Sequence, residues 1–317
     1  MFFWDDGLKL SKANLAIDFP RRQPRAFISH AHSDHMARHE YALCTPQTAT
    51  LYQARYGPRP TFPIPYRTPT EWGGLRLTTY PAGHCLGSAM LLAEDGRQSL
   101  LYTGDFKLAA AATCEPAELP RADLLVIEST FGDPGYRLPP RAEVIEQLLA
   151  LVRQTLHEGG LPVIEAYALG KSQEVTRLLT DQGFSVLQHR DVYAMSRVYE
   201  ACGVSLGLHA LLAGPPPLGQ VVVVPPRTPR LGAGREVRIA VTGWAVDPQA
   251  KYRLHVDHAI PLSDHAGYDD LFEAVRRVGA EKIFCTHGPG SFVDRLREAG
   301  FNAYRLGKCS EVQRRLF

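Results

Sequence analysis

The chain has 317 residues, of which 45% are hydrophobic and 21% are charged, and its formal net charge is +2. This length is enough for a large buried core and predicts more than one subdomain, and the composition is that of a soluble globular protein. The near-neutral charge argues against binding of nucleic acid through bulk charge alone, although a local basic groove remains open.

The first residues and the cysteines bear on where the protein works. The chain begins Met1-Phe2-Phe3-Trp4-Asp5-Asp6, without the basic start and apolar run of a signal peptide, and no stretch is long enough to span a bilayer. Six scattered cysteines form no Cys-x-x-Cys pair, which argues against a disulfide scaffold or a thiolate zinc site. We therefore expect a cytoplasmic protein without membrane contact.

The first predicted strands cover residues 14–19 and 26–28, separated by a break at Pro20 to Pro24. Asp18 stands near the end of the first strand, where position alone makes it an ordinary turn residue. The second strand leads directly into a cluster of histidines. This arrangement places a polar, ligand-type segment at the end of a buried strand.

The cluster is His-x-His-x-Asp-His, formed by His30, His32, Asp34 and His35. Alternate side chains on a strand end point the same way, so His30 and His32 can face one point. If a helix follows, Asp34 and His35 lie in its first turn and can face a second point. Imidazole and carboxylate are ligands that suit zinc or a similar divalent ion. The alternative is a polar loop that happens to be rich in histidine.

Three more ligand-type residues follow at strand ends or in glycine-rich loops. His84 lies between Gly83 and Gly87, ahead of an apolar strand at 89–93, and the glycines leave room for a metal. Asp105 and Glu128 each end an apolar strand, where function commonly gathers in α/β sheets. Taken alone, His84 could be a surface residue and Glu128 could cap a turn.

The middle of the chain alternates helices and strands. An amphipathic helix is predicted over 140–158, then strands at 161–164, 185–187 and 221–224 and a helix at 193–201. A helix that opens near Gly170-Lys171-Ser172 offers free amide groups and a cation to a phosphate. Helix capping by Ser172 and a solvated Lys171 explain the same residues equally well.

The last eighty residues return to strand-helix order. Strands are predicted at 237–241, 259–262 and 282–287, with a helix after the second and another at 292–299. His265 follows the second of these strands and His287 ends the third. Two histidines at strand ends are the second strong indication of a site.

These motifs resemble the metallo-β-lactamase superfamily of hydrolases, whose signature is the His-x-His-x-Asp-His segment. The segments 127–130, 263–266 and 286–288 are similar to three additional motifs of its β-CASP branch, and the whole looks most like the bacterial ligase-associated DNA exonucleases. The resemblance implies an α/β fold, namely an αββα sandwich with an inserted α/β cap. The expected parts are a core of residues 1–133, a β-CASP cap of residues 134–236 and the rest of the core at 237–317.

The resemblance also implies a site for two divalent metal ions, Zn²⁺ or Mn²⁺. Asp105 would bridge the ions, and Asp18 would support the ligands from behind. His265 would donate a proton to the leaving oxygen, held and kept charged by Glu128, while Lys171 and Ser172 would contact a neighbouring phosphate. Asp34 would also be a catalytic residue. One ion would be held by His30, His32 and His84, and the other by Asp34, His35 and His287.

The function that follows is a metal-dependent DNA exonuclease of DNA repair, which hydrolyses phosphodiester bonds and associates with a DNA ligase or helicase. One alternative is an RNA-processing ribonuclease of the same branch. His287 favours it, because RNA-acting members carry histidine there and the DNA-repair members of higher organisms carry valine. Two further alternatives are a small-molecule thioesterase or lactonase and a non-catalytic subunit.

Overall fold

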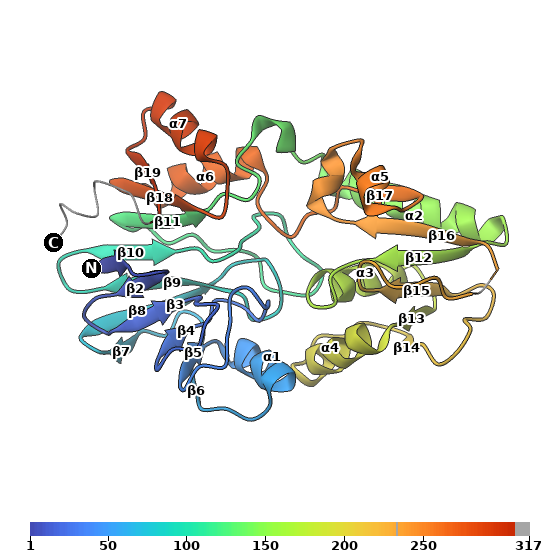
Figure 1. Ribbon diagram of the computed structural model, residues 1–317, viewed down its shortest axis with the longest axis horizontal. Coiled ribbons are helices and arrows are strands. Elements are labelled where there is room, and N and C mark those ends of the chain that lie inside the picture. Colours follow the sequence, from blue (N-terminus) through green and yellow to red (C-terminus); the bar gives the residue numbers. More distant parts are fainter. Residues whose placement is uncertain (233, 308–317) are drawn as a thin grey trace. The chain divides into compact units, whose positions relative to one another are not determined.

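The computed structural model describes residues 1–232 and 234–307, and the chain separates into two compact units. The first unit contains Met1–Ala110, Glu115–Pro134 and the described residues from His265 to Gly307 (Figure 1). The second contains Ala111–Cys114 and Gly135–Asp264. The first unit is thus assembled from both ends of the chain, with the second inserted between them.

Two sheets form the centre of the first unit. The smaller sheet runs in the order β1-β2-β3-β4-β5-β6, and the larger in the order β19-β18-β11-β10-β9-β8-β7. The strands of the smaller sheet are Phe2–Trp4, Leu8–Leu10, Leu15–Ile17, Ala26–Phe27, Ala42–Cys44 and Thr61–Pro63. Those of the larger sheet, β7 to β11 and then β18 and β19, are Thr70–Trp72, Leu75–Pro81, Ala89–Glu94, Ser99–Tyr102, Leu124–Glu128, Lys282–Thr286 and Ala303–Arg305.

Side chains along β9 point alternately to the two faces of the larger sheet, and they show how the layers pack together. Leu91 lies in a core cluster that contains side chains of both sheets, such as Phe27 and Val126. Met90 and Leu92 point to the opposite face, where they join side chains of α6 (Tyr268–Val278) and α7 (Gly290–Glu298). The two sheets therefore pack face to face, and helices cover the outer face of the larger one.

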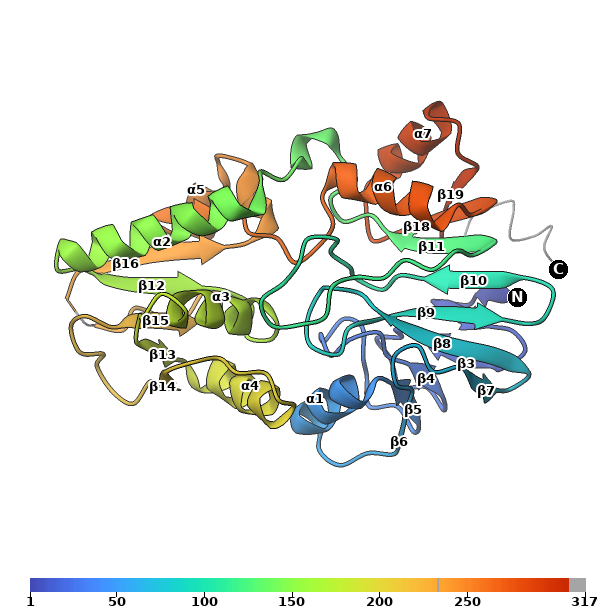
Figure 2. The ribbon, with the colours of Figure 1, turned by 180° about the vertical axis from the view of Figure 1, so that it is seen from behind.

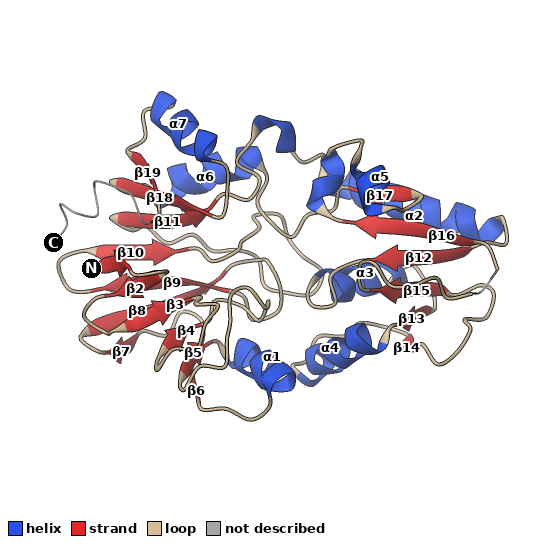
Figure 3. Ribbon diagram, in the orientation of Figure 1, coloured by secondary structure: helices blue, strands red, loops and turns tan. Residues whose placement is uncertain are grey.

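A further helix, α1 (Pro46–Tyr56), contacts β5 and β6 of the smaller sheet. Thr45 caps its first turn, since the hydroxyl accepts from the amide of Thr48 at 3.2 Å, and proline occupies the first helical position. The order helix, sheet, sheet, helix confirms the α/β class expected from the sequence (Figure 3).

The second unit is built on a sheet whose described strands pair in parallel, in the order β14-β13-β15-β12-β16-β17. Helices α2 and α3 pack on one face through Val144, Leu148 and Val175, which join Ile164 and Val223 in one core cluster (Figure 2). The strands, β12 to β17, are Leu161–Glu165, Val186–Gln188, His209–Leu211, Val221–Val224, Glu236–Val241 and His258–Ile260. The helices, α2 to α5, are Arg141–His157, Lys171–Thr180, Arg190–Ala201 and Ala250–Leu254.

The structure differs from the sequence-based expectation in two places that concern the site. The chain after the first histidines forms a turn, closed by the amide of His35 and the carbonyl of His32 at 3.2 Å, where a helix was considered. The second unit also continues to Asp264, whereas the return to the core was expected at 237. The reason is that β16 pairs with β12 along five residues, so this segment completes the sheet of the second unit.

Candidate metal centre

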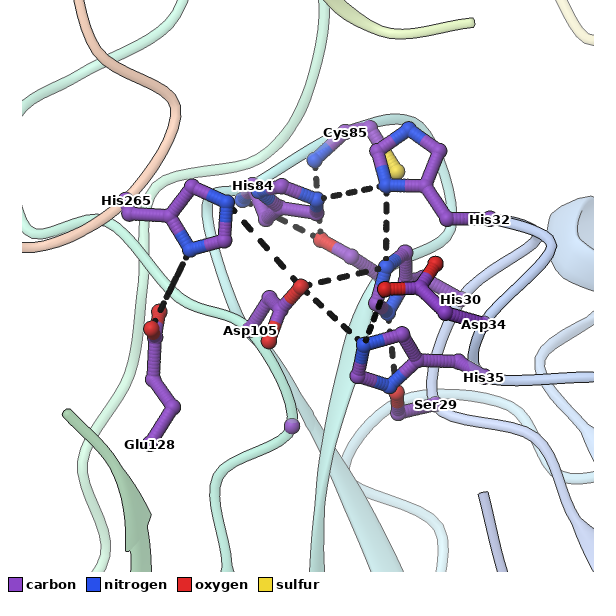
Figure 4. Close-up of polar contacts among 12 residues, drawn as sticks. Ser29, His30, His32, Asp34, His35, His84, Cys85, Asp105, Glu128 and His265 are labelled. Atoms are coloured by element: carbon purple, nitrogen blue, oxygen red, sulfur yellow. Dashed lines mark hydrogen bonds and ion pairs between the residues drawn. The ribbon is translucent and has the colours of Figure 1, made fainter. Parts of the chain in front are cut away.

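Three imidazoles meet at the carboxyl end of the strands of the first unit. Nε2 of His30 and Nε2 of His84 each lie 3.0 Å from Nδ1 of His32 (Figure 4). His30 and His84 are buried and His32 is half-buried. Three ring nitrogens that face one another in this way offer three of the donors that a tetrahedral site for a divalent ion requires.

The Asp105 carboxylate lies against this group and against a second one. Its Oδ2 atom is 3.6 Å from Nε2 of His30, 3.2 Å from Nε2 of His35 and 4.0 Å from Nε2 of His265. Gly104 allows the approach, because it has a φ of 55° and a Cβ there would stand 2.7 Å from the side chain of Ser29. One carboxylate oxygen thus faces three imidazoles from two distant parts of the chain.

The second group is more open. Asp34 Oδ2 lies 3.7 Å from Nε2 of His35, and 78% of the Asp34 side chain is exposed. The ring of His287, also exposed, has its centroid 5.6 Å from that of His35. His287 has a φ of 55°, and a Cβ on Gly288 would stand 1.9 Å from the carbonyl oxygen of Ser129, so only glycine permits this turn.

Behind the imidazoles, the buried Asp18 carboxylate is a hydrogen-bond hub. Its oxygens accept from the amide of Ser29 at 2.7 Å, from the Ser29 hydroxyl and from the Tyr102 hydroxyl at 2.9 Å. Nδ1 of His35 lies 2.8 Å from the same carboxylate, which leaves Nε2 of His35 facing Asp105. A carboxylate behind a ring in this way fixes its orientation and tautomer.

His265 and Glu128 form a pair at the edge of the cluster. Nδ1 of His265 lies 2.9 and 3.1 Å from the two oxygens of Glu128, which is 1% exposed. Glu128 is itself held by the amide of Phe106 at 3.0 Å and the hydroxyl of Thr130 at 2.5 Å. The outer nitrogen of His265 therefore points toward Asp105, as Figure 4 shows.

The electrostatics of the cluster follow from crowding and burial. Burial lowers the pKa of His30 well below its usual value, and the neighbouring imidazoles lower it further. For His35 burial acts in the same direction, but the carboxylates of Asp105 and Asp18 raise its pKa well above the usual value. Burial opposes ionisation of Asp105, yet the imidazoles of His35 and His265 hold its pKa well below the ordinary range.

The donor set fits divalent metal ions. Ligand atoms of His30, His32, His84 and Asp105 all lie within 4.8 Å of one another, and so do those of Asp105, Glu128 and His265. Neutral imidazole nitrogens and carboxylate oxygens are the donors that zinc and manganese accept. A third such group comprises Asp18, His30 and His35, where Asp18 is turned away from the common centre toward the back of the rings.

Lys171 and Ser172 lie in the second unit at the start of α3. The Lys171 ammonium is 2.5 Å from Oδ1 of Asp264 and is 2% exposed. The Ser172 hydroxyl donates to the carbonyl of Ala166 at 3.2 Å and is also buried. These contacts give both side chains a place in the packing of the second unit, and their contact with a phosphate stays a prediction.

Sequence reasoning overlooked several supporting side chains: Ser29, Ser88, Tyr102 and Thr130. Ser88 accepts from the amide of His84 at 3.2 Å and so shapes the loop that carries this histidine. Ser29 stands next to a recognised motif and Thr130 lies within one, and these positions could have indicated them. Tyr102 meets Asp18 across 84 positions of sequence, and no local pattern points to such a contact.

Comparison with curated proteins finds relatives much longer than this chain. The chain is 38% identical over 322 aligned positions to a protein of Opitutus terrae named Probable DNA ligase, a match that covers 98% of this chain and 32% of that protein. Transcription termination factor FttA of Methanocaldococcus jannaschii is 35% identical over 149 residues, 45% of this chain and 24% of the factor. Endoribonuclease YSH1 of Yarrowia lipolytica is 35% identical over 143 residues, 44% of this chain and 17% of the enzyme.

The chain thus spans about a third of the length of the first relative and a quarter or less of the other two. No protein-family model matches it. A solved structure, a protein of unknown function from Enterococcus faecalis, shares the fold with a TM-score of 0.62 at 13% identity, over 90% of this chain and 80% of that one. Among the described residues, no helix has the length and apolar character needed to cross a membrane.

Proposed function

We propose that this chain, which belongs to the metallo-β-lactamase superfamily and to its β-CASP branch, is a metal-dependent nuclease that hydrolyses phosphodiester bonds in DNA. The observation that carries the proposal is the meeting of three imidazoles at Asp105 Oδ2: His30 and His35, one from each ligand group, and His265 with its buried partner Glu128. A thioesterase or lactonase centre would not need the last two residues. In this proposal the second unit is the β-CASP cap.

The proposed ligands divide into two sets that share one carboxylate. One ion would be held by His30, His32 and His84, and Asp105 would bridge to the other. When bound, two divalent ions neutralise phosphate charge and activate water for attack on phosphorus. The ligands of the second ion would be Asp34, His35 and His287.

His265 is assigned the proton that the leaving oxygen requires. Its Nδ1 is occupied by Glu128 at 2.9 Å, so its Nε2 is the nitrogen left to face the reacting centre. Glu128 fixes the ring because its own oxygens are held by Phe106 and Thr130. Asp18 does the same for His35. Buried carboxylates therefore orient two imidazoles of the site, His35 and His265.

DNA is favoured over RNA by the extent of the similarity. The match to the protein named Probable DNA ligase covers 98% of this chain, so a segment like the whole chain occurs within that protein. The matches to the endoribonuclease and the termination factor cover less than half of it. This supports a nuclease that works with a ligase in DNA repair, with exonuclease action as the expected mode. RNA cleavage is the second candidate, and His287 is the residue that favours it.

The decisive experiment uses the purified chain, end-labelled single-stranded DNA and RNA of the same sequence, with Zn²⁺ or Mn²⁺ supplied. We expect metal-dependent cleavage of the DNA, with a product ladder that reveals whether cutting starts at an end. Asp34→Ala should abolish cleavage, whereas Asp247→Ala, which alters a carboxylate of the second unit, should not. Cleavage of RNA alone would reverse the substrate assignment, and cleavage of neither would refute the nuclease proposal.

A further inference from the structure

The parallel sheet of the second unit has a point where its connections change direction. After β12 the chain continues to β13 on one side of the sheet, and after the neighbouring strand β16 it continues to β17 on the other side. Ligands of open α/β sheets bind outside the carboxyl ends of the strands at such a point. The residues that follow β12 and β16 are therefore the first place to look for a binding surface.

Exposed aromatic and basic side chains follow three adjacent strands there. Tyr167, two residues after β12, is 59% exposed, and Trp244, three residues after β16, is 41% exposed. Arg227 is exposed and stands three residues after β15, the strand on the other side of β12. We propose that this row (Arg227, Tyr167 and Trp244) binds a single strand of nucleic acid. That the strand is DNA rests on the function proposed above.

The aromatic rings suit unpaired bases. An exposed aromatic ring contributes little hydrophobic stabilisation to the fold. Two such rings after neighbouring strands therefore indicate a binding role. Aromatic side chains in a row offer stacking faces to successive bases, and duplex DNA cannot use them because its bases already stack on each other. Trp244 is held in place by an edge-to-face contact with Tyr136, with ring centroids 5.2 Å apart.

Arg227 is held in a backbone conformation that arginine seldom adopts. Its φ is 64°, in the left-handed region that favours glycine or asparagine. Its amide donates to Oε2 of Glu165 at 3.1 Å, and Oε1 of Glu165 accepts from Nε of Arg238 at 2.7 Å. The buried Glu165–Arg238 ion pair thus holds the backbone of Arg227 in this strained conformation. An arginine kept at such a position indicates a role for its side chain.

The charge of this edge also suits a phosphate backbone. Two carboxylates near the strand ends, Glu165 and Asp264, are buried, and each faces a cation, Arg238 at 2.7 Å and Lys171 at 2.5 Å. They therefore add little negative field around Arg227. Arg190 follows β13, but Asp191 lies 3.6 Å from it and offsets its charge, so we leave it out of the row.

The test is binding of a fluorescein-labelled twelve-residue oligothymidylate to the full chain by fluorescence anisotropy. EDTA stops hydrolysis during the binding series, and cleavage by the same variants is measured separately with Zn²⁺ supplied. Tyr167→Ala and Trp244→Ala should each raise Kd about 5- to 100-fold for the single strand and leave Kd for a duplex nearly unchanged. Arg227→Asn should weaken both and lower the slope of log Kd against log salt by about 0.7, with no loss of thermal stability.

Matched controls separate the row from general surface effects. Tyr252→Ala removes a tyrosine that is 63% exposed on α5, and Arg235→Asn removes an exposed arginine at the opposite, amino end of β16. Neither should change Kd more than twofold. Unchanged binding in both aromatic variants, or equal losses in the controls, overturns the row. If the chain binds single strands through the row but cleaves nothing, the nuclease proposal is refuted and the row stands. If the chain cleaves DNA but the variants bind as tightly as wild type, the row is refuted and the nuclease proposal stands.

Discussion

The two units bury charged side chains in different ways. In the first, imidazoles crowd one another and a shared carboxylate, as His30, His84 and Asp105 do around His32. In the second, buried carboxylates face buried cations: Glu165 and Glu236 share Arg238, and Asp264 lies against Lys171. Crowded ligand groups are satisfied by a metal ion, whereas an ion pair satisfies itself. Under the proposed function, the buried charges of the first unit serve chemistry, whereas those of the second unit stabilise its fold.

If that contrast holds, removing a charge from the first unit should cost activity and not folding. Asp105→Asn should lower the rate of DNA cleavage by on the order of a thousandfold or more, because both proposed ions lose a shared ligand. Zinc content per chain should fall, while Tm of the metal-free protein stays within a few degrees of wild type. Asp247→Asn, in an exposed pair with Arg253, is the matched control. Cleavage at the wild-type rate by Asp105→Asn would contradict the assignment.

Removing the proposed proton donor should separate chemistry from metal binding. His265→Ala should slow cleavage of DNA about 100- to 1,000-fold with zinc content unchanged, and Glu128→Gln should cost about tenfold. Thymidine 5′-p-nitrophenyl phosphate has a leaving group that needs no proton, so the His265→Ala defect should nearly vanish on it. An equal defect on both substrates would show that His265 acts in some other way.

In the second unit the same kind of change should cost stability and spare the metal centre. Glu165→Gln removes one of the two carboxylates that face the buried Arg238 guanidinium, the other being Glu236, and should lower the free energy of unfolding by about 1.5–3 kcal/mol. Urea denaturation measures this loss. The zinc content of the folded protein should stay at the wild-type level. A lower zinc content would show that this ion pair also supports the candidate metal centre and would contradict the contrast between the units.

A buried histidine of the first unit outside the metal centre offers a pH test. His39 lies with its ring nitrogens 3.1 and 3.2 Å from the amides of Gln23 and Ala37, and burial lowers its pKa to about 4. Folding thus favours the neutral ring, while the unfolded chain binds a proton near pH 6.5. The neutral His39 ring therefore contributes to the free energy of unfolding above about pH 6.5. As the pH falls toward about 4 this contribution is lost, which lowers the free energy of unfolding by about 3 kcal/mol.

Urea denaturation at about pH 7 and about pH 4 checks this, with His39→Gln as the comparison. The variant should be less stable at neutral pH and should lose less stability than wild type on acidification. A wild type and variant that lose the same amount would show that other groups cause the acid sensitivity.

The smallest expected effect comes from the support behind the ligands. Tyr102→Phe removes one of the donors to Asp18 and should cost about 1 kcal/mol of stability and about tenfold in zinc affinity. Competition with a fluorescent chelator measures the affinity. Tyr41→Phe, whose ring stacks on Trp72 at 5.9 Å, is the control and should leave zinc affinity unchanged. Equal affinities in the two variants would place Tyr102 outside the support of the centre.

Local pattern determined most of the secondary structure and the candidate ligands. Helix α2 was expected at 140–158 and covers Arg141–His157, because one face of it is apolar at helical spacing. His30, His32 and His35 were found through spacing within six residues, and the strand-end positions indicated Asp105, Glu128 and His265. Helix α1 was overlooked although Thr45 and Pro46 are a normal helix start, because its buried face is weakly apolar.

Only the tertiary structure decided which distant residues meet. The Tyr102 hydroxyl reaches Asp18 across 84 positions, and His265 reaches Glu128 across 137. The end of the second unit at Asp264 depends on β16 pairing with β12, a long-range choice between two sheets that the apolar run at 237–241 does not encode. Spacing along the chain dictates which side chains share a face, whereas contacts between strands far apart in sequence depend on how whole sheets pack.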